Sequence, residues 1–199
     1  MCSSDLTLGG IQKLAGQYTE AEANLETAYR LCTEFGHRYG QAAALADLGE
    51  VQQMTGQYAQ ALETLQRALE LYQDLGNRLG EAAALTYLGE LRRVLRQYAK
   101  AERLLRRALD LHRGLGNRLG QAETLTSLGA IQNARGSLDE SHATLRQARL
   151  LYQELDNQLG LSAALFALAD TLRDMGQHDD AAAHRELALN VLTHIEQDL

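Results

Sequence analysis

A forty-residue repeat is the feature that most constrains the fold of this chain. When the sequence is shifted against itself by forty positions, the same residue types recur at several registers. The recurring positions include Leu8, Leu48, Leu88, Leu128 and Leu168, the glycines Gly9, Gly49, Gly89 and Gly129, and the alanines Ala28, Ala68, Ala108, Ala148 and Ala188. Chance does not produce this many coincidences at one offset, so the chain is built from tandem units.

Each repeat contains two helical patterns, which we call the A helix and the B helix. In the third repeat the apolar residues of both recur every three or four positions, which predicts helices with one buried face. They are Leu85, Leu88, Leu91 and Leu95 in the A helix, and Tyr98, Ala101, Leu104, Leu105, Ala108, Leu111 and Leu115 in the B helix. The chain has no proline and is rich in strong helix formers, which also predicts an all-α protein.

Small residues inside the helices indicate close helix packing. A glycine inside a helix costs about 1 kcal/mol relative to alanine, so Gly49, Gly89 and Gly129 need a packing reason. We expect them to let the paired B helix approach, with Ala61 and Ala68 as the matching small surface. One antiparallel helix pair cannot bury such faces alone, whereas stacked pairs can. The predicted fold is therefore an α-solenoid of antiparallel helix pairs.

These motifs resemble the tetratricopeptide repeat. The resemblance rests on Leu-Gly before a polar turn, G-x-Y before the B helix, and two alanines seven residues apart in that helix. It is closest to the forty-residue variety with a G-[ND]-R-x-x-[EQ] linker, found in G-protein-signalling modulators, kinesin light chain and bacterial regulators. The sequence departs from the family in lacking proline after the B helix, and in having leucine early in the A helix at Leu45, Leu85, Leu125 and Leu165. The resemblance implies a right-handed superhelix that is not an enzyme and binds a protein or peptide in its concave groove.

We predict one solenoid over residues 7–199, with repeats at 7–36, 37–76, 77–116, 117–156 and 157–199. Residues 1–6, MCSSDL, are predicted to be a non-native leader, because a common sequencing adapter read from a GTG start encodes them. If so, N-terminal domains are missing from the chain. The last repeat carries Ala169, His178 and Arg185 in place of the usual glycine, tyrosine and leucine. We interpret it as a natural cap, with Leu199 near the true end.

The hexapeptide LGNRLG, which occurs twice, could be a phosphate loop or a joint between repeats. A phosphate loop needs Gly-Lys-Ser/Thr after a strand, but Gly80 is followed by Glu81 and no strand is predicted. A joint explains the residues better. Gly76 would adopt a left-handed conformation, Asn77 would cap the next helix, Leu79 would be its apolar anchor, and Gly80 would allow close packing.

The sequence contains no recognisable catalytic or metal-binding pattern. The six histidines form no HExxH motif and no i,i+4 pair, and Cys2 and Cys32 form no CxxC pair. No nucleophile, base and orienting residue occur together in a recognisable pattern. We therefore predict no catalytic residue, no cofactor and no metal.

The expected binding site is the concave groove lined by the A helices. Its predicted residues lie off the leucine stripe: Asp47, Glu50, Gln53, Thr86, Tyr87, Glu90, Arg93, Thr126, Asn133, Phe166, Asp170 and Arg173. Tyr87 and Phe166 are the expected hot spots because they are the aromatic members. Relatives that clamp a C-terminal carboxylate use Lys and Asn where this chain has Ala43, Ala83, Glu50 and Glu90, so that ligand is disfavoured. Signalling-modulator arrays often have Asn where Glu50 and Glu90 stand. Glutamate at these positions leads us to expect a partner with basic or amide donors.

Two other functions stay open. The chain could be the C-terminal sensor or regulatory array of a larger bacterial NTPase or transcription regulator, or a spacer. The upstream gene sequence would separate the first from a free-standing binding module. The oligomeric state is not indicated.

The net charge of −7 conceals a segregation, because residues 91–120 carry nine Lys/Arg and two acids. This basic block, Arg92 to Arg118, is expected to be a solvated outer surface. Without interleaved aromatic residues it does not predict nucleic-acid binding. The longest apolar run, 159–169, is about half the length that a membrane helix needs. With no secretory signal visible, a cytoplasmic location is expected.

Overall fold

The computed structural model describes residues 8, 10–12 and 15–197, of which the side chains of 195–197 are not considered. The described residues are helical with short joints and contain no strand, which confirms the all-α prediction. The helices are α2 (Tyr18–Glu34), α3 (Arg38–Met54), α4 (Tyr58–Asp74), α5 (Arg78–Val94), α6 (Tyr98–Gly114), α7 (Arg118–Ala134), α8 (Leu138–Glu154), α9 (Gln158–Asp174) and α10 (His178–Gln197). The A helices are α3, α5, α7 and α9, and the B helices are the even-numbered ones. The predicted leader, residues 1–6, lies outside the described residues.

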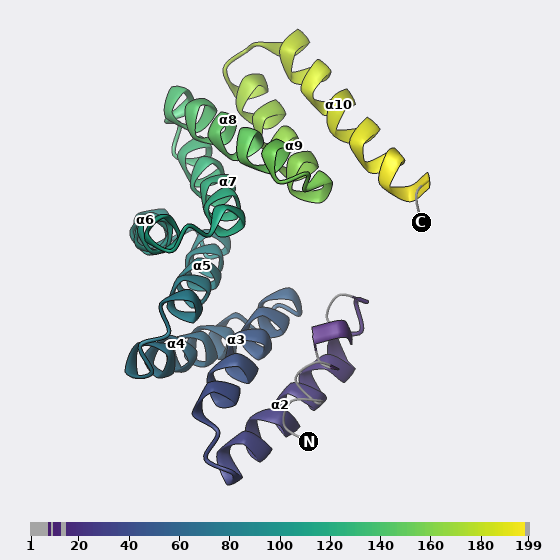
Figure 1. Ribbon diagram of the computed structural model, residues 1–199. Helices are drawn as coiled ribbons and strands as arrows, with labels where there is room; N and C mark the ends of the chain where they lie inside the picture. Colours follow the sequence, from purple (N-terminus) through teal and green to yellow (C-terminus); the bar gives the residue numbers. More distant parts are fainter. Residues whose placement is uncertain (1–7, 9, 13–14, 198–199) are drawn as a thin grey trace. The chain divides into compact units, whose positions relative to one another are not determined.

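The chain divides into two compact units, Met1–Gln97 and Tyr98–Leu199. In each unit, helices that follow one another in the chain pack side by side, and α3 also contacts α5 while α7 contacts α9 (Figure 1). A single domain over residues 7–199 stays a prediction. None of the described helices is both long enough and apolar enough to cross a membrane.

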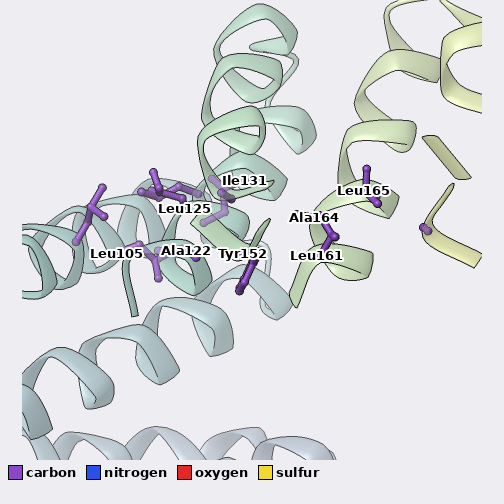
Figure 2. Close-up of a cluster of buried hydrophobic side chains, with 13 residues drawn as sticks. Leu105, Ala122, Leu125, Ile131, Tyr152, Leu161, Ala164 and Leu165 are labelled. Atoms are coloured by element: carbon purple, nitrogen blue, oxygen red, sulfur yellow. The ribbon is translucent and has the colours of Figure 1, made fainter. Parts of the chain in front are cut away.

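The second unit has a continuous apolar core that joins its A and B helices. Leu105 of α6, Leu125 and Ile131 of α7, Tyr152 of α8 and Leu165 of α9 all belong to it (Figure 2). Leu105, Ile131 and Leu165 are fully buried. In the first unit Leu25 of α2 packs with Leu48 and Val51 of α3 in a corresponding cluster. The leucine stripe predicted from the sequence is thus the buried face.

The stretch LGNRLG is a joint between a B helix and the next A helix. Gly76 has φ +64°, and its N–H donates to the carbonyl of Gln73 at 3.0 Å, while the Asn77 N–H donates to the carbonyl of Tyr72 at 2.9 Å. These two bonds close α4 in a Schellman motif. The Asn77 side-chain oxygen then accepts from the Gly80 N–H at 3.0 Å and caps α5. The predicted roles of Gly76 and Asn77 are confirmed.

Gly80 has a different role from Gly76, because it leaves room for an aromatic ring. A Cβ at Gly80 would lie 2.3 Å from Cδ1 of Tyr72, in the last turn of the preceding B helix. The same relation recurs at Gly160, whose Cβ would lie 2.1 Å from Cε1 of Tyr152. Close packing against the preceding repeat, predicted for Gly80, is therefore confirmed.

Two predictions about leucines near the joints are wrong. Leu79 is not an apolar anchor, since it is 53% exposed. It precedes Gly80, which faces the B helix, and a step of one residue along a helix turns the side chain by about 100° away from that contact. Leu115, expected on the apolar face of its B helix, is 46% exposed because α6 already ends at Gly114.

The mid-helix glycines allow close packing, but the partner differs from the prediction. A Cβ at Gly49 would lie 2.5 Å from Cγ of Leu65, and one at Gly129 would lie 2.4 Å from Cγ of Leu145. A leucine of the paired B helix therefore fills each gap, rather than the alanines Ala61 and Ala68. Those alanines are also fully buried.

This contact explains a drift in the last repeat. Ala169 stands where Gly129 stands one repeat earlier, and Arg185 stands where Leu145 stands. Arg185 is exposed, so no buried leucine competes with the methyl group of Ala169 for the same space. Glycine is replaced in the repeat that also lacks the opposing leucine.

Gly129→Ala should lower the free energy of unfolding by about 1–3 kcal/mol, because the new methyl group overlaps the fully buried Leu145. Urea denaturation measures the change. Gly114→Ala is the matched control in the same unit, since a Cβ there meets nothing within 4 Å. Equal stability of the two variants would contradict the Gly129–Leu145 contact.

Arg96→Gly should raise the free energy of unfolding by about 1 kcal/mol, because Arg96 occupies the left-handed region with φ +56°. Glycine occupies this joint position in other repeats, with Gly56, Gly136 and Gly176 at φ +79° to +80°. Thermal unfolding measures the gain. Asp156→Gly, at φ +52°, is expected to gain less because aspartate tolerates this conformation better. A loss of stability in Arg96→Gly would refute the assignment.

His112 replaces the junction tyrosine in the third repeat and is 4% exposed. Its ring lies against Gly120, where a Cβ would be 2.4 Å from Cε1. Asn117 Nδ2 lies 3.1 Å from Nδ1 of the ring and donates to it, which requires an unprotonated Nδ1. Burial lowers the pKa of His112 below its usual value of 6.5.

Stability should therefore fall on acidification in a way that depends on His112. The unfolded chain binds the histidine proton more readily than the folded chain, so lowering the pH below about 6.5 favours unfolding. His112→Tyr keeps an aromatic ring against the glycine, as Tyr72 and Tyr152 do, but does not titrate there. The free energy of unfolding of the wild type should fall more steeply with pH than that of the variant, by up to about 1.4 kcal/mol per pH unit. Parallel pH profiles of the two proteins would overturn this account.

Candidate functional site

The predicted groove residues are distributed over both compact units, and each group is described by itself. In the first unit they lie on the neighbouring helices α3 and α5, and in the second on α7 and α9. All twelve side chains are partly or largely accessible, with Arg173 the exposed member. They lie on A helices beside the buried leucine stripe, as the sequence predicted.

In the first unit the polar face combines an ion pair with a structural contact. Arg93 Nε donates to Glu90 Oε2 at 2.8 Å, across one turn of α5. Asp47 of α3 lies near the buried Tyr72, whose pKa is raised to about 12 by burial first and by the Asp47 charge second. Thr86 donates its hydroxyl to the carbonyl of Ala82. Glu90 and Arg93 therefore contact each other, whereas Thr86 bonds to the backbone of its own helix.

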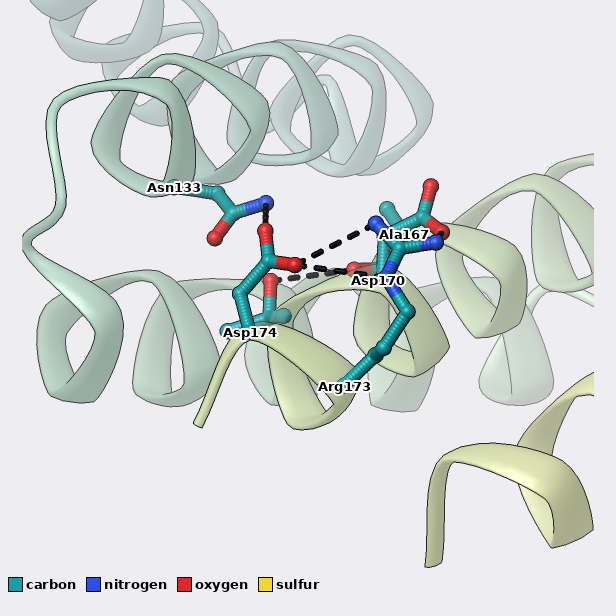
Figure 3. Close-up of polar contacts among 6 residues, drawn as sticks. Asn133, Ala167, Asp170, Arg173 and Asp174 are labelled. Carbon is teal, nitrogen blue, oxygen red and sulfur yellow. Dashed lines mark hydrogen bonds and ion pairs between the residues drawn. The ribbon is translucent and has the colours of Figure 1, made fainter. Parts of the chain in front are cut away.

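In the second unit a hydrogen bond joins the two A helices at this face. Asn133 Nδ2 of α7 donates to Asp174 Oδ2 of α9 at 3.1 Å (Figure 3). Arg173 lies beside it, with Nη1 2.9 Å from Asp170 Oδ1 and Nε 3.3 Å from Asp174 Oδ1. The structure therefore links three of the predicted residues, Asn133, Asp170 and Arg173, through Asp174, which was not predicted.

Asp174 was missed because it occupies the last turn of α9, where the other repeats have apolar residues. Met54, Val94 and Ala134 stand at the corresponding positions. The signal that could have found it is this change from apolar to acidic at one register. The packing of α7 against α9 brings Asp174 close to Asn133 of the preceding repeat, and no local sequence pattern indicates this contact.

Thr126 makes two hydrogen bonds next to the joint. Its hydroxyl donates to the carbonyl of Ala122, and it shares a hydrogen bond with Tyr152. Burial raises the pKa of Tyr152 to about 12, the Thr126 bond opposes this, and the charge of Glu123 adds to it. Thr126 therefore helps to hold the ring that lies under Gly160.

The two aromatic residues of the predicted set are both half-buried. Tyr87 lies on α5, and Phe166 on α9 packs against the core of the second unit. A half-buried ring presents a firm apolar surface that loses little freedom when a partner covers it. These positions suit anchor contacts.

Two of the predicted groove residues, Gln53 and Asn133, have an unpaired side-chain carbonyl oxygen. Gln53 Oε1 and Asn133 Oδ1, at equivalent positions two repeats apart, are buried and accept no hydrogen bond within the described residues. Gln52 Oε1 and Gln132 Oε1, one position earlier, are unpaired in the same way. A buried acceptor without a donor costs about 1–3 kcal/mol, so an incoming donor would be stabilised here. The recurrence of glutamine at 52 and 132 in an apolar stripe was the sequence signal for the second pair.

The basic block, Arg92 to Arg118, is partly neutralised by local acids. Arg106 pairs with Glu102 at 2.7 Å, Arg113 approaches Asp110 at 4.0 Å, and Arg118 pairs with Glu154. Most of these side chains are exposed, and exposed pairs contribute at most about 1 kcal/mol. The pattern fits the expected solvated surface.

Within the described part of the chain no group of three or more His, Cys, Asp or Glu residues is arranged to hold a metal ion.

The sequence profile described as tetratricopeptide repeat matches residues 1–74 and 80–154. Together with the helix pairs and their joints, this match shows that the chain belongs to the tetratricopeptide repeat family. The family inferred from the motifs is confirmed. No curated protein matched the sequence.

Solved structures of similar fold share little sequence with this chain. BtubC (BKLC) from P. vanneervenii superposes with a TM-score of 0.78 at 18% identity, over 95% of this chain and 78% of that one. The Q17M form of a putative kinesin light chain of Podospora anserina, with nearly identical TPR-like repeats, gives 0.73 at 17% identity, over 98% and 96%. A Rap protein complexed with competence and sporulation factor gives 0.77 at 14% identity, over 100% and 66%. These similarities confirm the solenoid fold.

Proposed function

We propose that this chain is a non-enzymatic binding module that recognises an extended segment of a protein partner on the exposed faces of its A helices. The observation that carries the proposal is the pair of buried, unpaired carbonyl oxygens, Gln53 Oε1 and Asn133 Oδ1. They recur at the same register of α3 and α7. A peptide backbone or side-chain amide supplies the N–H groups that these oxygens lack.

The charge of the faces favours a donor-rich partner. In the first unit Glu50 and Glu90 outnumber Arg93, and in the second Asp170 and Asp174 outnumber Arg173. Both arginines already lie within hydrogen-bond distance of an acid on their own helix. An incoming lysine, arginine, asparagine or glutamine therefore meets acceptors, whereas an acidic segment is repelled.

In the second unit we propose that α7 and α9 hold such a segment together. The Asn133–Asp174 bond links α7 to α9, so the two helices present a connected polar face. Phe166 on α9 supplies the apolar anchor, and Asp170 and Asp174 supply the acceptors. The Rap protein of similar fold forms a complex with competence and sporulation factor, which supports the proposal of a bound partner.

An unbiased peptide display library tests the proposal with purified protein. We expect enrichment of peptides that combine an apolar residue with Lys, Arg, Asn or Gln. The double variant Phe166→Ala, Asp170→Asn should weaken the selected peptides by roughly tenfold or more, as expected for loss of a hot spot and a charged acceptor. Tyr87→Ala provides the corresponding measurement in the first unit.

Leu187→Ala, Asp179→Asn is the matched control, because it removes an apolar group and a charge from exposed positions of the B helix α10. Its affinity should stay within about twofold of the wild type, the scatter expected for positions outside the contact. Circular dichroism checks that each variant is folded. Equal loss in the control, or enrichment of acidic peptides, would contradict the proposal.

The chain could also serve as the regulatory array of a larger bacterial protein, since it spans only 66% of the Rap protein that it resembles in fold. The gene sequence upstream of residue 1 decides this. An in-frame NTPase or DNA-binding domain would support the regulatory array, and a start codon with its own ribosome site would oppose it.

A further inference from the structure

A pocket that differs chemically from the A-helix faces lies between B helices of the second unit. It has a volume of about 360 Å³, with α8 and α10 as walls and Leu172 of α9 at its base. The α8 wall consists of His142, Arg146 and Arg149, and the other wall consists of Gln177, Asp180 and His184. None of these residues belongs to the A-helix faces described above.

The three α8 residues face the pocket together because of their spacing. His142, Arg146 and Arg149 are separated by four and three positions, which places them on one side of a helix. Leu145, between them, is fully buried in the core. The α8 wall therefore combines a rigid backbone with three nitrogen-bearing side chains aimed into one space.

Arg149 carries the most informative atom of the pocket. Its Nε is buried and has no hydrogen-bond partner within the described residues. An N–H of a charged group that is withdrawn from water without an acceptor is unfavourable. Arg149 lines the pocket, and a ligand oxygen that reached this N–H would supply the missing acceptor.

The charges of the pocket are not balanced. Two arginines face one carboxylate, that of Asp180, which is exposed. The ion pairs found among the described residues include neither arginine and do not include Asp180. The pocket therefore favours an anion.

The donors suit an anion with several oxygens. Each guanidinium offers N–H groups in a planar fork that matches phosphate geometry. His184 Nδ1 lies 2.9 Å from the carbonyl of Asp180 and donates to it, so the neutral ring has no N–H left at Nε2 for an anion. Beside the two guanidinium groups, His142 and the side-chain amide of Gln177 can donate. A carboxylate has two oxygens and one charge, too few for this set, whereas a phosphate group has three or four oxygens and up to two charges.

We propose that this pocket binds a phosphate group. The group is either inorganic phosphate or the phosphoryl group of a modified side chain on a partner, and the chemistry of recognition is the same for both. The site does not depend on the peptide-binding function proposed above, so either can fail alone.

Isothermal titration of the full chain with sodium phosphate tests the proposal, against sodium chloride at equal ionic strength and against acetate. We expect saturable binding of phosphate only. Arg146→Gln and Arg149→Gln should each weaken it by about tenfold or more, the loss expected for one charge-assisted hydrogen bond. Arg146 is exposed, so its variant remains informative if Arg149→Gln does not fold.

Arg185→Gln is the control, because it removes one positive charge from an exposed position of α10 that does not line the pocket. It should bind phosphate as the wild type does. Absence of saturable binding, equal binding of acetate, or an equal loss in the Arg185 variant would overturn the proposal.

Titration with a phosphoserine peptide and its unphosphorylated form distinguishes the two sources. Tighter binding of the phosphopeptide than of inorganic phosphate, abolished by dephosphorylation, supports a modified partner. Equal affinity for the phosphopeptide and the free ion supports inorganic phosphate as the ligand.

Discussion

The close approach of A-helix backbone to B-helix side chains is the constraint on which the rest of the structure depends. Gly80 and Gly160 leave space for the rings of Tyr72 and Tyr152, and Gly49 and Gly129 leave space for Leu65 and Leu145. A methyl group at any of these four positions would overlap its neighbour. Because these contacts hold A helices closely against B helices, the leucine stripe of the A helices is buried and their remaining side is left for polar residues.

That arrangement yields two kinds of surface with opposite chemistry. The A-helix faces carry carboxylates and unpaired carbonyl oxygens, which accept hydrogen bonds. The pocket between α8 and α10 carries two arginines and an unpaired N–H, which donate them. A partner that touched both kinds of surface would have to present donors to one and a phosphate group to the other. The two proposals therefore concern separate sites on a common scaffold.

Much of the fold could be predicted from the sequence because its determinants are local. The positions of the helices follow from the spacing of leucines and alanines, and the joint at Gly76 and Asn77 follows from the preferences of those residues for left-handed and capping conformations. The functional faces were predicted less completely. The sequence predicted which side of their helices Asn133 and Arg173 occupy. It did not predict that both contact Asp174. The contact of Thr126 with Tyr152 was also not indicated by the sequence.

By itself, the sequence determined the period, the two helices of each repeat, the joints between them and the family, because each of these depends on residues only a few positions apart. The tertiary structure decided which side chain fills the gap at Gly49, that Leu79 is exposed, and that Arg149 Nε is buried without a partner. It also decided that Asn133 and Asp174, forty-one positions apart, are joined by a hydrogen bond. These features depend on distances between side chains on different helices, which packing sets and no local pattern encodes.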